Sequence, residues 1–138
     1  MTEAEHHEVV RHWLSYAMSD LSLAERLSND SGGAPWQACF HAQQAVDKAI
    51  KAILVLLQIE FKKSHDLASL AALVPPDWAI AEKLAEVAEL TPWAVEARYP
   101  GDWPDATDRD AMEAVAKAKL ILEGILADFG RHGVAVNK

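Results

Sequence analysis

The segment from Trp36 to Leu57 constrains the fold of this chain more than any other part of the sequence. Its core-forming positions recur every three or four residues and fall on one side when successive residues are placed about 100° apart. They are Trp36, Cys39, Phe40, Gln43, Val46, Ile50, Ile53, Leu54 and Leu57. A long helix with one wide apolar face must bury that face, so the sequence predicts a helical protein with this segment as its central helix.

Two further stripes of the same period predict long partner helices. The first consists of Val10, Trp13, Leu14, Ala17, Leu21, Ala24 and Leu27, and the last of Met112, Val115, Ala118, Leu122, Ile125, Leu126 and Phe129. The turn-forming cluster 29–33 and Pro35 separate the first helix from the central one. Thr107 and Asp110 have the spacing of a capping box at the start of the last helix, and Gly130 is a natural end for it.

Shorter elements are expected between the central and last helices. Ser64 can cap a helix that carries Leu67, Leu70, Ala71 and Val74 before Pro75 and Pro76 end it, and Asp77 can cap the next, with Ile80, Leu84, Val87 and Ala88. Residues 99–105 contain too many breakers for regular structure. The sequence thus predicts an all-α, up-and-down bundle of about five helices in a single domain, residues 1–138, with its core at about 9–130 and a loose tail at 131–138.

Charge and composition exclude several classes of protein. The formal net charge of −8 argues against bulk binding to duplex DNA, which requires many cations to displace phosphate counterions. Cys39 is the only cysteine, so no disulfide framework or thiolate metal cluster is expected. The N-terminal residues lack an apolar signal core and no apolar run is long enough to span a membrane, so we expect a cytoplasmic protein without a membrane partner.

A polar stripe lies on the other side of the central helix. Its members are Gln37, His41, Gln44, Lys48 and Lys51, within a sector of roughly 80°. Lysine, imidazole and amide groups together can hold a phosphate or an acidic partner. The alternative is an ordinary solvated helix face, and spacing alone favours that alternative slightly.

Four stretches of the sequence together resemble one known family. They are the run from Phe40 to Ala52, the run from Ala17 to Ala24 with Asp20-Leu21, Ser64-His65-Asp66-Leu67, and Ala97-Arg98-Tyr99-Pro100. In this order they are similar to the signature helix, the first helix, the Thr/Ser-His-Asp-Leu element and the Ala-Arg-Tyr-Pro element of the HEPN family, the higher eukaryote and prokaryote nucleotide-binding domain. The resemblance implies a helical bundle that commonly forms a homodimer, binds nucleotides or RNA, and works with a nucleotidyltransferase partner protein.

The resemblance does not extend to the family's ribonuclease motif, in which an Arg is followed by a His after four to six residues. Trp103, Pro104 and Asp105 stand where that His would follow Arg98. We therefore predict no catalytic residue at the motif position, and the missing histidine argues against an enzyme. No cofactor is implied, and no histidine has the neighbouring ligand residues expected of a metal site.

Together, the stripe and the resemblance predict a set of nucleotide- or phosphate-binding residues: His41, Gln44, Lys48, Lys51, His65, Arg98 and Tyr99. Alternative roles are open for two of them, since His65 can instead fix its own loop and Arg98 can cap helix carbonyls. Trp93 and Trp103 could stack on a base or bury a dimer interface.

Three functions stay open at this point. The first is a homodimeric nucleotide- or RNA-binding module that acts with a nucleotidyltransferase, as half of a pair of the toxin and antitoxin kind. The second is a metal-independent ribonuclease in which His41 or His65 replaces the missing histidine. The third is a protein-interaction module that binds no ligand.

Overall fold

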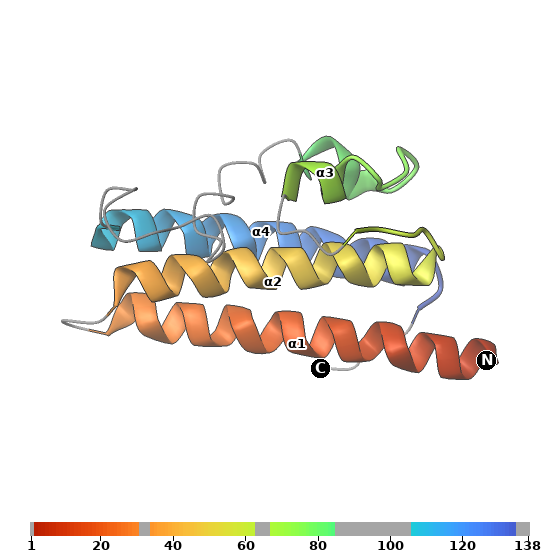
Figure 1. Cartoon of the computed structure of the whole chain (residues 1–138), viewed down its shortest axis with the longest axis horizontal. Coiled ribbons are helices and arrows are strands. Elements are labelled where there is room, and N and C mark those ends of the chain that lie inside the picture. The colour runs from red at the N-terminus through yellow and green to blue at the C-terminus, as the bar shows by residue number, and fades with distance from the viewer. Residues whose placement is uncertain (1, 31–33, 63–66, 85–105, 135–138) are drawn as a thin grey trace.

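In this computed structural model, residues 2–30, 34–62, 67–84 and 106–134 are described. Three long helices lie side by side: α1 (Glu3–Asn29), α2 (Pro35–Leu56) and α4 (Asp108–Arg131) (Figure 1). α1 and α2 run antiparallel, whereas α2 and α4 point the same way. The described residues form helices and turns and contain no strand, so the predicted all-α bundle is confirmed.

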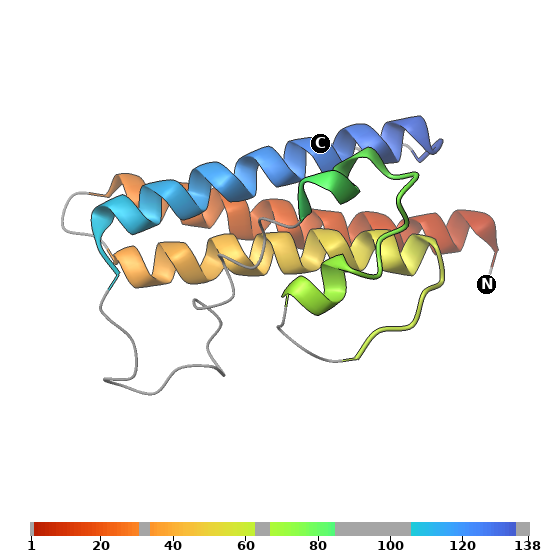
Figure 2. The same ribbon diagram turned by 90° about the horizontal axis from the view of Figure 1, so that it is seen from above.

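Two smaller elements follow α2 and precede α4 in the sequence, and they cover one side of the bundle. They are the short helix α3 (Leu67–Ala71) and the 3-10 helix η1 (Ala79–Glu82). Figure 2, seen from above, shows η1 beside the C-terminal half of α4 and α3 beside α2. α3 packs against α2, and η1 packs against α4. Both elements thus lie on the same side of the bundle.

The N-terminus of α1 is fixed by a capping box. The Thr2 hydroxyl accepts a hydrogen bond from the Glu5 backbone N–H, and the Glu5 carboxylate accepts one from the Thr2 backbone N–H, each at 3.1 Å. The hydrogen bond from the Thr2 backbone lowers the pKa of the exposed Glu5 carboxyl. The helix therefore begins at Glu3, well before Val10, where the apolar stripe begins.

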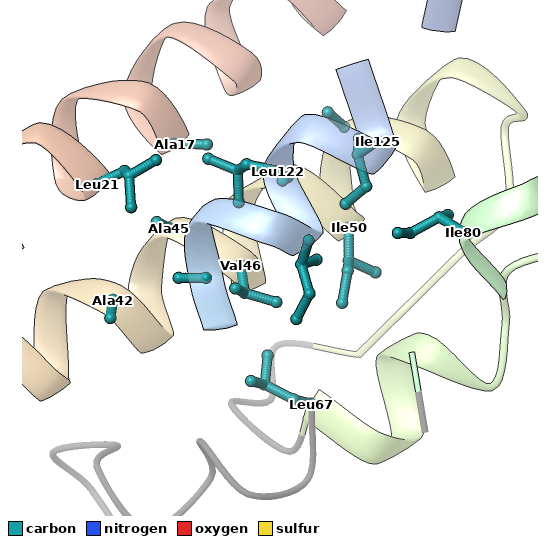
Figure 3. Packing of buried hydrophobic residues seen from close by; sticks show 14 of the residues in the cluster. Ala17, Leu21, Ala42, Ala45, Val46, Ile50, Leu67, Ile80, Leu122 and Ile125 are labelled. Carbon is teal, nitrogen blue, oxygen red and sulfur yellow. The ribbon is translucent and has the colours of Figure 1, made fainter. Parts of the chain in front are cut away.

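The core lies between the three long helices. Figure 3 shows residues of α1, α2 and α4 that interdigitate, with Leu67 and Ile80 closing the side toward α3 and η1. The central position of α2 is confirmed: twelve of its residues are buried, and Cys39 is among them as a small apolar side chain. Met112 is an exception to the predicted pattern, since it is 64% exposed. Its neighbours Ala111, Ala114 and Val115 carry the packing of this part of α4 instead.

The prediction for Asp77 is wrong. Trp78 is the N-terminal cap residue of η1, and no side chain of its own segment caps that end. Asp128 of α4 takes this role by accepting hydrogen bonds from the backbone N–H groups of Ala79 at 3.3 Å and Ile80 at 2.8 Å. Pattern reading could not find this cap because the carboxylate comes from a residue almost fifty positions away. Ser64, Val87, Ala88 and the expected loop 99–105 lie outside the described residues.

The end of α4 also differs from the expectation. Gly130 lies inside the helix, which continues to Arg131. Gly133 supplies the left-handed backbone conformation, with φ of 78°, and the Val134 N–H then bonds back to the Phe129 carbonyl at 3.0 Å. Val134 is buried, so the part of the expected tail up to this residue packs on the core.

Candidate functional site

A carboxylate on α1 joins two residues of the predicted polar stripe. Asp20 Oδ1 lies 3.0 Å from His41 Nδ1, and Asp20 Oδ2 lies 2.5 Å from Lys48 Nζ. We call these three residues the Asp20 cluster. The His41 and Lys48 side chains are 26% and 30% exposed and that of Asp20 is 13% exposed, so the cluster lies at the surface where α1 meets α2.

The cluster forms because of the helical spacing of its members. His41 and Lys48 are two turns apart on α2, so their side chains leave the helix on the same face. The small buried residues Ala17, Ala42 and Ala45 let α1 approach α2 closely (Figure 3). Asp20 then reaches both groups from α1 with its two carboxylate oxygens. A charge-assisted pair of this kind is directional and holds the imidazole in one orientation.

The other cation of the stripe, Lys51, belongs to a separate pair. Its Nζ lies 2.9 Å from Asp47 Oδ2 and 5.9 Å from the centre of the Phe61 ring. The Lys51 side chain is 12% exposed and Asp47 is buried. Lys51 therefore compensates a buried carboxylate and is less accessible to a ligand than Lys48.

Gln44, the remaining described member of the predicted site, donates a hydrogen bond to the side-chain oxygen of Gln43 at 2.6 Å. Gln43 is fully buried, as its place on the apolar stripe predicted. Gln44 thus links the polar stripe to the core of the bundle. His65, Arg98 and Tyr99 lie outside the described residues, as do Trp93 and Trp103.

An aromatic stack continues from the Asp20 cluster along α2. The His41 ring meets Phe40 edge-on, with ring centres 5.1 Å apart. Phe40 in turn lies parallel to Trp36, one turn back, with ring centres 5.6 Å apart. Both aromatic residues are partly exposed. The surface therefore offers an ammonium group and an imidazole that share one carboxylate, with aromatic rings beside the imidazole. These groups are suited to a phosphate and a base.

Sequence reasoning missed Asp20 and Asp47 as site residues. Asp47 stands on α2 itself, four residues before Lys51, and this spacing is the signal that indicates their pair. Asp20 has no such local signal, because its partners are 21 and 28 residues away on another helix. Only the packing of α1 on α2 brings it to the stripe.

Two kinds of feature are absent from the part of the chain that the structure describes. It contains no group of three or more His, Cys, Asp or Glu side chains that could hold a metal ion. None of its helices combines the length and apolarity needed to cross a bilayer.

The family model described as "HEPN domain" matches residues 10–127, which include the Asp20 cluster and most of the three long helices. The chain belongs to the HEPN domain family. The resemblance to this family is thus confirmed over most of the sequence.

Solved structures of similar proteins agree with this assignment. ST0689, described as an archaeal HEPN homologue, is 30% identical to this chain with a TM-score of 0.66, and the match covers 86% of this chain and 95% of that protein. TT1696 from Thermus thermophilus is 27% identical with a TM-score of 0.69, covering 86% of this chain and 97% of its own. No curated protein matches this chain.

Proposed function

We propose that this HEPN-domain protein is a small homodimeric module that binds a nucleotide or RNA through the Asp20 cluster. Within the same proposal, it acts with a nucleotidyltransferase partner as one half of a pair of the toxin and antitoxin kind. Family membership supports the general class.

The observation that carries the proposal is the Asp20 cluster, in which Lys48 and His41 share one carboxylate and His41 lies against Phe40. Lys48 uses one ammonium N–H toward Asp20 and has two more to offer, because lysine has three donors. The aromatic stack begins beside His41, which shares Asp20 with Lys48, so we expect the base of a nucleotide held by Lys48 to stack on Phe40. Base stacking on such side chains contributes about 1–3 kcal/mol per base.

The first test is thermal melting with and without nucleoside triphosphates and a short single-stranded RNA. A ligand that binds the native state raises the melting temperature. We expect Lys48→Gln to reduce this rise to less than half, because the substitution removes the most exposed cation of the cluster. Lys119→Gln, which changes an exposed lysine of α4, is the matched control and should leave the rise unchanged.

Glutamate substitutions at Lys48 and Lys51 are unsuitable for this test. Glutamate at Lys51 would stand beside the buried Asp47, and glutamate at Lys48 would stand beside Asp20. Either change would create a carboxylate pair and could unfold the protein for reasons unrelated to a ligand. A flat melting response for every ligand with wild-type protein would contradict the binding proposal and favour a protein-interaction module.

A second candidate, a ribonuclease with an unusual site, is favoured by one specific contact. When His41 donates its Nδ1 proton to Asp20, Nε2 keeps a lone pair and can act as a general base. An RNA cleavage assay without added metal separates the two functions. Cleavage that is lost in His41→Ala would support the enzyme, whereas intact RNA supports a binding module.

A further inference from the structure

We propose that Asp20 makes the cluster select its ligand by charge. The site then prefers the singly charged phosphodiester within an RNA strand to a doubly charged terminal phosphate. This inference rests on the proposed function, since it concerns the same site. It assigns to Asp20 a role in specificity that goes beyond holding two helices together.

Asp20 can have this role because its carboxylate is already the negatively charged partner of His41 and Lys48. One oxygen lies 3.0 Å from His41 Nδ1 and the other 2.5 Å from Lys48 Nζ. A phosphate that binds Lys48 through its remaining N–H groups must therefore lie near a fixed negative charge. Asp20 is only 13% exposed, so water screens this charge less than it would screen a fully exposed carboxylate.

The repulsion from Asp20 grows with the charge of the ligand. The negative charge of Asp20 cancels the positive charge of Lys48, which leaves the pair neutral. For unit charges about 4 Å apart in water, removing the carboxylate should raise the affinity about fivefold for a monoanion and about 25-fold for a dianion. A terminal phosphate is a dianion above its second pKa of about 6, whereas a phosphodiester carries one charge.

The nature of the neighbouring surface points to the same class of ligand. The repulsion must be offset by contacts that do not depend on charge. The Phe40 ring beside His41 and the Trp36 ring stacked on Phe40 can provide them. A nucleotide unit inside a single strand brings a base to stack and only one charge. Inorganic phosphate brings more charge and no base.

The experiment compares two probes that share base and ribose: adenosine 5′-monophosphate and its methyl ester, at about pH 8, where the first is a dianion. Affinities of the wild-type protein and of Asp20→Asn are measured by NMR titration. Asparagine keeps one acceptor oxygen, for either His41 or Lys48, while it removes the charge. We expect the gain in affinity from the substitution to be about fivefold for the ester and about 25-fold for the monophosphate.

Two controls keep the result interpretable. Asp77→Asn removes one negative charge from an exposed turn and should change neither affinity. Asp20→Ser also removes the charge and keeps an oxygen at the cluster, so it repeats the test if the asparagine variant folds poorly.

The outcomes separate this inference from the proposed function. Equal gains for both probes, weaker binding by Asp20→Asn, or the same gain in Asp77→Asn would overturn the role of Asp20 and leave a nucleotide site in place. Failure of both proteins to bind either probe or a short RNA would overturn the proposed function itself.

Discussion

Asp20 and Asp128 each join two parts of the chain through a carboxylate, but they use different kinds of partner. Asp128 is buried on α4 and accepts hydrogen bonds from the backbone N–H groups of Ala79 and Ile80, and it also pairs with Arg131. Asp20 pairs with two side chains, those of His41 and Lys48, and all three lie at the surface. The backbone groups that contact Asp128 are held in place by the fold, whereas the side chains that contact Asp20 can rearrange.

The surroundings of the two carboxylates strengthen the contrast. Beside Asp128, Trp78 is buried, lies edge-on to Phe129 and stacks on the ring of His132 at 4.1 Å. Losing Asp128 would leave the buried Ile80 N–H without its acceptor, which a side-chain movement cannot repair. His41 and Lys48, in contrast, can turn toward water or a ligand. We infer that the Asp128 junction serves stability and the Asp20 cluster serves binding.

The largest expected effect is on stability at Asp128. Asp128→Ala removes the acceptor of two backbone N–H groups at the start of η1, one of them buried, and should lower the free energy of unfolding by about 3 kcal/mol. Urea unfolding followed by circular dichroism measures this change. Asp108→Ala, at an exposed position in the first turn of α4, is the control and should cost less than about 1 kcal/mol. Similar losses at the two positions would mean that Asp128 matters no more for stability than an exposed carboxylate of the same helix.

A smaller effect on stability is expected at Asp20. Asp20→Asn keeps an oxygen between α1 and α2 and removes an ion pair that is partly exposed, so the loss should be about 1 kcal/mol or less. The same urea unfolding experiment measures it. Added salt should reduce the difference from wild type, because it screens the pair. A loss at Asp20 as large as that at Asp128 would mean that the cluster is mainly a structural link.

The two carboxylates also show what the sequence can and cannot predict. The periodic stripes of α1, α2 and α4 locate the long helices, because each helix buries a face that is written in its own sequence. The same rule places His41, Gln44, Lys48 and Lys51 on one side of α2. Spacing along α2 indicates that Lys51 meets Asp47, but the carboxylate that Lys48 meets comes from another helix, so Asp20 was not expected at the site.

The segment around η1 shows the same limit in the fold. Asp77 has the right residue type and position for a local cap, but Asp128 of α4 takes the role. Trp78, which no stripe included, is buried between α4 and η1 by its contacts with Phe129 and His132. In both cases a long-range contact decides the local structure, and a reading based on spacing along one segment cannot detect it.

Binding at the Asp20 cluster is best tested by an NMR titration of the histidine side chains with a short single-stranded RNA. His41 belongs to the Asp20 cluster, whereas His132 stacks on Trp78 at the Asp128 junction and serves as an internal control in the same spectrum. We expect a saturable shift of the His41 imidazole signals, with those of His132 unchanged. Signals of His41 that stay fixed while RNA binds, or that do not move at any RNA concentration, would contradict it.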